Sequence, residues 1–197
     1  MNTLKAEKRD LNTKAKRLRR EGYVTGNVFG KEIQGSIPIK ITGTEAEALL
    51  KHGGKGSQVM LEVDGQKINA LIKEIDYDSL KHQILEIDFQ ALVKGEKVHS
   101  VAEVVLLNHE KVSTGVIQLL LEEISYKATP DNLIEKIEID AGNLRAGDTV
   151  KVEDLDIAKN QHIDLTTPLD AVVVSVSEVH NTAEAEEEST EEGSAEA

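Results

Sequence analysis

The sequence predicts a mainly β protein: a compact N-terminal sheet or barrel with one short helix, a second β-rich domain, and a disordered acidic tail. Val and Ile supply 34 of the 197 residues, whereas Phe, Tyr and Trp supply five. This bias favours strands with aliphatic cores. Leu, Val, Ile and Phe supply 56 residues, well above the roughly 20% below which chains tend to be disordered. The last 18 residues are strongly acidic and poor in apolar side chains, which is typical of disorder.

The first predicted elements are a short basic helix and a strand. Residues 13–21 favour one or two helical turns that end at Gly22, with Leu18 as the single strong apolar side chain. A helix this short depends on tertiary support or on a bound polyanion. Apolar and polar side chains then alternate over residues 33–41, which predicts a strand.

A second short helix and a hairpin follow. Thr44 and Glu47 have the spacing of a capping box, which predicts a helix that ends at Gly53. Asp64-Gly65 lies between two runs of alternating apolar residues. It predicts a tight hairpin turn, because these residues readily adopt positive φ. Further strands are predicted at residues 85–89, 98–107, 116–127, 134–140, 148–152 and 171–179.

This series of elements divides into two domains and a tail. We expect an N-terminal domain over residues 1–92, a C-terminal β-rich domain over 93–180, and a disordered acidic tail over 181–197. Residues 117–121 are apolar except for Gln118, which predicts a core strand or a short buried helix.

Charge is distributed unevenly along the chain. The formal net charge is −13, and a uniformly acidic surface would repel nucleic acid. Residues 1–31, however, carry nine Lys and Arg against three Asp and Glu, whereas residues 178–197 carry eight Glu and no cation. This asymmetry favours an N-terminal end that binds a polyanion, with a solvated basic face as the open alternative.

No pattern in the sequence indicates an enzyme. The absence of Cys excludes disulfides, thiolate metal sites and cysteine nucleophiles. The six His residues are scattered, and the glycine-rich stretch 53–57 lacks the order of a phosphate-binding loop. No nucleophile elbow, zinc-protease helix or kinase motif occurs. We therefore expect no catalytic residue, no metal site, no cofactor and no small-molecule substrate.

The sequence also gives no indication of a membrane segment. Its apolar runs are far shorter than the roughly 18 residues that a spanning helix needs. The N-terminal stretch is positively charged but lacks the apolar core of a signal peptide. We expect a cytoplasmic protein that does not contact a membrane.

Several motifs occur in an order that resembles a known family. A basic stretch at residues 14–20 leads into a segment with regularly spaced glycines at 22–30, and the hairpin at Asp64-Gly65 follows. Later motifs lie at residues 85–89, 115–118 and 139–148. Over about residues 1–180 the chain resembles the long form of large-subunit ribosomal protein twenty-five, the general stress protein Ctc family.

The resemblance implies an N-terminal β-barrel that binds 5S ribosomal RNA in the large ribosomal subunit, followed by a β-rich C-terminal domain. Such barrels read an irregular RNA helix through its widened minor groove, which fits recognition by shape, phosphate and 2′-hydroxyl contacts. By position, Phe29 is an RNA contact or a core residue, and Asp88 contacts a base or satisfies the backbone at a strand end. The full set of predicted RNA-binding residues is Arg9, Lys14, Lys16, Arg17, Arg19, Arg20, Phe29, Tyr77 and Asp88.

The chain departs from the family pattern on this implied RNA face. Thr25, Asn27 and Phe29 stand where Pro, an aliphatic residue and Tyr are usual. Tyr77 stands where Arg is common, and Glu86 replaces His. Fewer positive charges and one added negative charge should weaken RNA binding. The alternative function is therefore a stress-related interaction protein of the same fold, with weakened or lost RNA binding.

Overall fold

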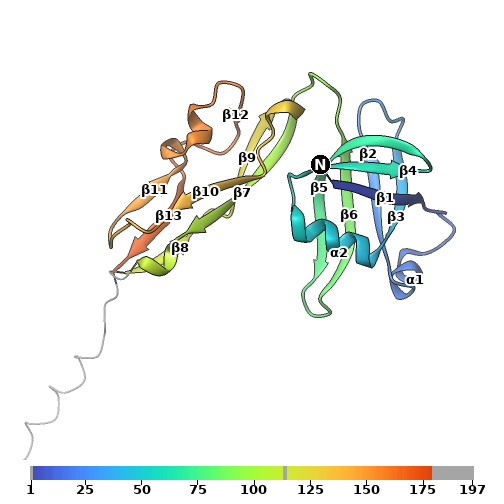
Figure 1. Ribbon diagram of the computed structural model, residues 1–197, viewed down its shortest axis with the longest axis horizontal. Coiled ribbons are helices and arrows are strands. Elements are labelled where there is room, and N and C mark those ends of the chain that lie inside the picture. Colours follow the sequence, from blue (N-terminus) through green and yellow to red (C-terminus); the bar gives the residue numbers. More distant parts are fainter. Residues whose placement is uncertain (1, 113–114, 179–197) are drawn as a thin grey trace, which may run out of the picture.

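The computed structural model describes residues 2–112 and 115–178, and its first half is a closed barrel (Figure 1). Six strands pair in the order β1-β3-β2-β6-β5-β4. The barrel closes because β1 pairs antiparallel with β3 and parallel with β4. The strands are β1 (Asn2–Lys8), β2 (Tyr23–Phe29), β3 (Ser36–Thr42), β4 (Gln58–Val63), β5 (Gln66–Asp78) and β6 (Gln83–Ala91).

The closed barrel and the sheets that follow it confirm the predicted mainly β fold class. The predicted acidic tail, residues 181–197, lies outside the described residues. The Asp64-Gly65 turn between β4 and β5 has φ angles of 49° and 82°, as the hairpin prediction requires. Strand β1 was not predicted, because Leu4 and Ala6 are its only apolar side chains and its partner β4 is distant in sequence.

Two helices accompany the barrel, α1 (Ala15–Arg20) and α2 (Gly43–His52). Helix α1 lies within the predicted segment. Helix α2 starts earlier than predicted, because Thr42 is its N-cap, where the Thr42 hydroxyl accepts a 3.3 Å hydrogen bond from the Glu45 amide. Thr42 also ends β3, so the pairing of β3 with β2 decides where the helix begins. No helix in the described part of the chain is both long and apolar enough to span a membrane.

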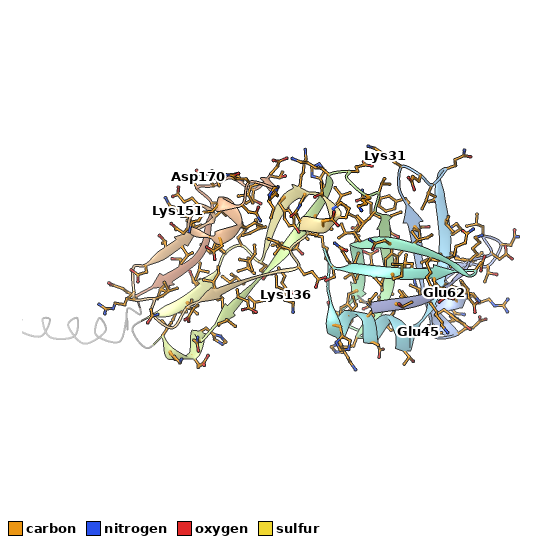
Figure 2. The ribbon with its side chains drawn as sticks, turned by 45° about the horizontal axis from the view of Figure 1, so that its top comes forward. Lys31, Glu45, Glu62, Lys136, Lys151 and Asp170 are labelled. Carbon is orange, nitrogen blue, oxygen red and sulfur yellow. The ribbon has the colours of Figure 1, made fainter. Side chains whose placement is uncertain are left out.

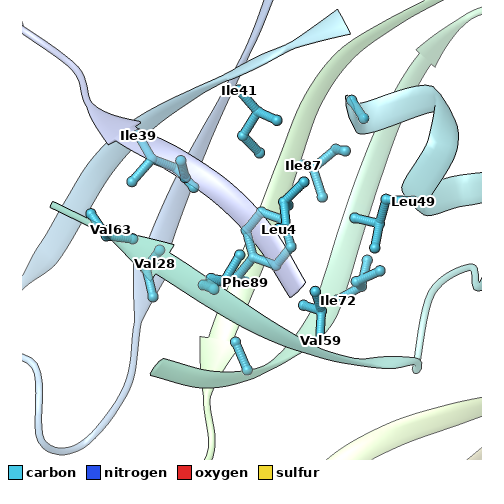
Figure 3. Close-up of a cluster of buried hydrophobic side chains, with 14 of the residues drawn as sticks. Leu4, Val28, Ile39, Ile41, Leu49, Val59, Val63, Ile72, Ile87 and Phe89 are labelled. Atoms are coloured by element: carbon cyan, nitrogen blue, oxygen red, sulfur yellow. The ribbon is translucent and has the colours of Figure 1, made fainter. Parts of the chain in front are cut away.

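Aliphatic side chains around one aromatic ring fill the barrel (Figure 3). Phe89 is fully buried and lies among Leu4, Val28 and Ile72. Leu49 of α2 belongs to the same cluster, so the helix packs against the barrel core. Phe89 is therefore a core residue, which fits the aliphatic composition.

The second half of the described chain contains two small sheets (Figure 1), with strand orders β10-β7-β9-β12 and β11-β13-β8. Strand β10 runs parallel to β7, while β9 runs antiparallel to β7. Short 3-10 segments include η3 (Val152–Asp154) and η4 (Asp156–Lys159), which follow β11. The strands are β7 (Val98–Leu107), β8 (Val116–Leu119), β9 (Glu123–Ala128), β10 (Lys136–Asp140), β11 (Thr149–Lys151), β12 (Asp164–Leu165) and β13 (Val172–Ser177).

Most predicted strands of this half occur, but the stretch 116–127 differs. It forms two strands, β8 and β9, in different sheets. Of the two expectations for 117–121, a core strand or a short buried helix, the structure has the strand, but its burial is incomplete. Ile117, Leu119 and Leu121 pack half-buried against the second core, whereas Leu120 is 58% exposed. The physical reason is that β8 lies at the edge of its sheet, so fewer neighbours cover its side chains.

The two halves meet at the loop that follows α2. Gly56 has φ 86°, and a Cβ added to it would lie 2.1 Å from the Val101 carbonyl oxygen. Only glycine fits this close approach of two backbones. Nearby, the Lys73 ammonium donates a 2.9 Å hydrogen bond to the His99 carbonyl. Burial lowers the pKa of Lys73 below its ordinary value.

Candidate nucleic-acid interface

Helix α1 displays the basic side chains of the N-terminal segment. Its buried residue Leu18 attaches it to the barrel. Lys14, at the N-cap, is exposed, as are Lys16, Arg17 and Arg20. The basic residues of the last turn are also favourable for the helix itself, because its C-terminal end carries partial negative charge.

Arg19 is the exception on this helix, because its guanidinium group lies against the barrel. Its Nε donates a 3.0 Å hydrogen bond to the Leu85 carbonyl oxygen, and its Nη2 lies 3.7 Å from a Glu86 carboxylate oxygen. The Arg19 side chain retains 29% exposure. Arg19 therefore connects α1 to β6 while keeping an open side toward solvent.

One side of the barrel next to α1 is formed by the parallel strands β2 and β6. Val28 and Phe89 point into the core, so the residues that alternate with them face outward. We call these outward side chains the β2–β6 face. They are Thr25, Asn27 and Phe29 of β2 and Glu86, Asp88 and Gln90 of β6, which lie opposite one another in register. Thr25 is itself fully buried, and its hydroxyl accepts a 3.3 Å hydrogen bond from Arg19 Nη2, so the other five residues form the accessible part of the face.

Hydrogen bonds link the two strands across this face. The Asn27 backbone N–H donates to Asp88 Oδ1 at 3.0 Å, and the Asn27 side-chain amide donates to the same oxygen at 3.2 Å. The amide also donates to Glu86 Oε1 at 3.1 Å. Glu86 thus lies between Asn27 and Arg19. In this structure Asp88 satisfies the backbone of a neighbouring strand, which was one of the two interpretations of this residue.

The two predicted aromatic contacts lie in different places. Phe29 is half-buried on the β2–β6 face and is not part of the barrel core. Tyr77 is 50% exposed near the end of β5, and its hydroxyl lies 3.4 Å from His82 Nδ1. Tyr77 pairs with Ile84 of β6. The next residue of β6 is Leu85, and its carbonyl oxygen accepts the hydrogen bond from Arg19.

Arg9 approaches the same side of the barrel from β1. Its backbone N–H donates to the Pro38 carbonyl oxygen at 2.9 Å, and Pro38 pairs with Asn27. The guanidinium group donates to the Thr13 carbonyl oxygen, which precedes α1. The structure therefore gathers the predicted residues around α1 and the β2–β6 face, with Tyr77 at the periphery.

Sequence reasoning missed the residues that organise this face. Asn27 and Glu86 stood out only as departures from the family, although together they bind Arg19 and Asp88. It also missed a groove of about 400 Å³ between β1, β3 and β4, lined in part by Lys40 and Tyr23. Lys40 Nζ lies 4.7 Å from the Tyr23 ring centroid. A hydrogen bond to Glu7 raises the pKa of Lys40.

The site carries no arrangement suited to metal binding. Within residues 2–112 and 115–178, no three His, Asp or Glu side chains are grouped so that they could hold a metal ion. The chemical character of the α1 and β2–β6 surface is that of exposed cations beside hydrogen-bonding amide and carboxylate groups. Such a surface is suited to binding phosphates and polar base edges.

Comparison with known proteins gives matches over both halves of the chain. Residues 4–89 match the Ribosomal L25p family, and residues 97–180 match the C-terminal domain of ribosomal protein TL5. The chain is 33% identical to large ribosomal subunit protein bL25 of Caldanaerobacter subterraneus over 200 residues, which cover 98% of each chain. It is 32% identical to the bL25 protein of Thermoanaerobacter sp. strain X514 over 88% of this chain and 87% of that one.

A similar match occurs with large ribosomal subunit protein bL25 of Listeria monocytogenes, at 31% identity over 78% of this chain and 75% of the relative. These relatives and the two matched domains confirm the resemblance seen in the motif order. The chain therefore belongs to the family of large ribosomal subunit protein bL25, in the long form that carries both domains.

Proposed function

We propose that this member of the large-subunit ribosomal protein family is non-catalytic and binds 5S ribosomal RNA through α1 and the β2–β6 face. The observation that carries the proposal is the concentration of exposed cations on one small helix in a chain of net charge −13. Lys14, Lys16, Arg17 and Arg20 project into solvent beside a surface of polar side chains.

On the proposed surface, different residues contact the phosphates and the bases of the RNA. The cations of α1 neutralise phosphates, which fixes orientation but carries no sequence information. Asn27 and Asp88 hold each other in place, and a carboxylate has further lone pairs with which it accepts a hydrogen bond from a base. Phe29 supplies a partly exposed ring edge beside them.

A gel shift with 5S ribosomal RNA, measured over a range of salt concentrations, tests the proposal. If binding neutralises about five phosphates, raising salt from about 50 to about 200 mM weakens binding roughly 10²–10³-fold. A duplex RNA without an internal loop is the matched control and should bind more weakly. Absence of a shift at low salt, or an affinity that does not respond to salt, would refute the proposal.

A second candidate function is a stress-related interaction protein that keeps the fold with weakened or lost RNA binding. It is favoured by Glu86, which places a carboxylate 3.7 Å from the Arg19 guanidinium on the proposed RNA surface. Sedimentation of cell extracts through sucrose gradients distinguishes the two candidates. Comigration with the large subunit supports RNA binding, while a free pool in growing and in stressed cells supports the alternative.

We also infer that the chain folds as an N-terminal unit over residues 1–92 and a second unit over 93–180, and that it works in the cytoplasm with the ribosome. Two separate hydrophobic clusters support this division, one around Phe89 and one around Tyr126. The two units, expressed separately, should each give a cooperative unfolding transition. Aggregation of both would argue against the division.

A further inference from the structure

A groove of about 410 Å³ lies in the second half of the chain, between β10 and the segment that runs from β11 through η3 and η4. Figure 2 labels Lys136 and Lys151, which mark β10 and β11. Apolar side chains line part of the groove, including Ile134 and Val150, both half-buried. The proposed RNA surface is on the barrel, so it does not include this groove.

The backbone along one wall of the groove has an unpaired edge. The Glu103 amide donates to the Glu135 carbonyl oxygen at 3.0 Å, and the Ala141 amide donates to the Leu107 carbonyl oxygen at 2.9 Å. Backbone groups in a parallel pair alternate in direction, so the odd-numbered residues of this stretch bond to β7. The even-numbered residues Lys136, Glu138 and Asp140 therefore direct their N–H and C=O groups away from β7.

No described strand occupies that outer edge. Strand β10 is the terminal strand of its sheet, and β11 is the terminal strand of the other sheet. An unpaired edge beside a groove is the arrangement that accepts an added strand from another chain. A strand bound to the outer edge of β10 would lie in the groove, between β10 and the segment that contains Val150 and Asp154.

The charged side chains that line the groove are mainly negative. Its lining residues include four carboxylates but one cation, Lys136. Glu138 has no ion pair within residues 2–112 and 115–178. In the part of the chain that the structure describes, Asp156 forms an ion pair only with Lys159, at 3.6 Å, and solvent screens this exposed pair. The four carboxylates are those of Glu138, Asp140, Asp154 and Asp156.

We infer that this groove binds an extended, Lys- or Arg-rich peptide segment of another protein, which adds as a strand to the outer edge of β10. Backbone hydrogen bonds to Glu138 would give affinity for an extended chain. Because side chains of a strand alternate, its basic residues would reach the carboxylates while the residues between them face Ile134 and Val150. The acidic C-terminal segment of this same chain has the wrong charge to occupy the groove.

Fluorescence anisotropy with a labelled nine-residue peptide tests this inference on the full-length protein. The probe is Lys-Thr-Lys-Val-Lys-Thr-Lys-Val-Lys, which has alternating charge and a high strand propensity. Two controls accompany it: one has every Lys replaced by Glu, and the other has the Thr and Val replaced by Pro. The proline peptide keeps the charge but has no N–H group at its Pro positions, so it cannot pair continuously along a strand edge.

The probe is expected to bind, and both control peptides to bind at least about 10-fold more weakly. The Glu peptide loses the charge-assisted contacts, and the proline peptide loses backbone hydrogen bonds to the strand edge. Equal binding of the proline peptide would show general charge attraction and overturn strand addition. Failure of the probe to bind at low salt would overturn the whole inference. Preference for RNA over peptide at this groove, seen as competition by RNA in a variant that lacks the α1 cations, would also overturn it.

Substitutions in the protein test whether the probe binds in this groove. Glu138→Gln with Asp156→Asn should weaken the probe about 10-fold, since it removes two carboxylates without changing shape. Glu138→Pro removes an outward N–H and should abolish binding. Glu47→Gln, at an exposed position on α2, is the matched control and should change nothing. Unchanged binding in the double variant would exclude the groove, whatever the folding of the proline variant.

Discussion

The barrel pairs each of its six strands on both sides, whereas the sheets of the second half, within the described residues, leave β10 and β11 paired on one side only. The barrel therefore presents other molecules with side chains alone, above all the cations of α1. The second half presents free backbone edges beside carboxylates. One chain thus combines two surfaces of opposite charge, and its average charge of −13 describes neither.

The largest expected effect is a loss of stability in the barrel core that leaves the core of the second half unaffected. Phe89→Ala removes a fully buried ring from the barrel and should cost about 3–5 kcal/mol of stability. Hydrogen exchange followed by mass spectrometry should show lost protection in β2 and β6, with β7 and β9 protected as before. Leu80→Ala, at a 95% exposed position, is the control. Equal loss of protection in both halves would mean that the barrel and the sheets unfold as one unit.

The next effect concerns the contact between the halves. Gly56→Ala places a methyl group 2.1 Å from the Val101 carbonyl oxygen, so the loop must move. Gly35→Ala is matched, because Gly35 has φ 82° but open space around it, and backbone strain alone should cost about 1–2 kcal/mol. We expect a larger fall in Tm for Gly56→Ala and a changed small-angle scattering profile. Equal effects of the two substitutions would show that the close approach contributes nothing to stability.

RNA binding provides the third test, because we propose that the barrel half, and not the second half, binds RNA. Arg17 is largely exposed, and its one ion pair among the described residues is a 2.9 Å contact with Glu21 on the helix surface. Arg17→Ala should weaken 5S ribosomal RNA binding about 10-fold and reduce the salt slope by about one. Lys159→Ala removes a similarly exposed cation from the second half and should have no effect. Equal losses of RNA affinity in the two variants would indicate nonspecific electrostatic binding.

A smaller change of opposite sign is expected at Glu86. Glu86→Gln removes a negative charge next to Arg19 and keeps an oxygen that accepts the hydrogen bond from Asn27. RNA affinity should rise about threefold, as expected for removal of one partly exposed like charge from a phosphate-binding surface. A fall in affinity in the gel shift would show that the Arg19–Glu86 contact positions Arg19 for RNA instead of competing with it.

The smallest effect is a change in the pKa of one carboxylate of the second half, Asp140, with Asp78 of the barrel as the reference. Hydrogen bonds from Asn108 and from the Gly142 amide lower the pKa of Asp140, and the Lys81 amide lowers that of Asp78. A lowered folded-state pKa means that this stabilisation is present above pH about 4 and is lost as pH falls through the lowered value. In an NMR titration, Asn108→Ala should raise the pKa of Asp140 and leave Asp78 unchanged. Equal shifts at both would contradict this assignment.

Patterns in the sequence predicted those elements that are determined by residues close together along the chain. Asp64-Gly65 specifies its turn through positive φ, and β13 is recognisable from its valines. Thr42 and Thr44 both precede a Glu by three residues, so spacing alone leaves two starts for α2. The pairing of β3 with β2 determines that the helix begins after Thr42, and this pairing cannot be recognised from the sequence.

The candidate site shows the same limit. The basic stretch and the family resemblance identified the helix and its cations. They did not reveal that Arg19 turns toward the barrel, because its partner, the Leu85 carbonyl, lies far along the chain. Likewise, nothing local indicates that Asn27 would bind Asp88, since the contact depends on the parallel register of β2 and β6.

The parallel pair that closes the barrel has a consequence for synthesis. Strand β1 leaves the ribosome before β4, whose residues 58–63 are made much later. A pairing of such high sequence separation forms slowly, because loop-closure entropy must be overcome before contacts compensate it. During this interval the part of β1 that pairs with β4, residues 2–6, has no partner strand, although the end of β1 can already pair with β3. Lys5 and Lys8 in a strand with few apolar side chains limit its tendency to aggregate while it waits.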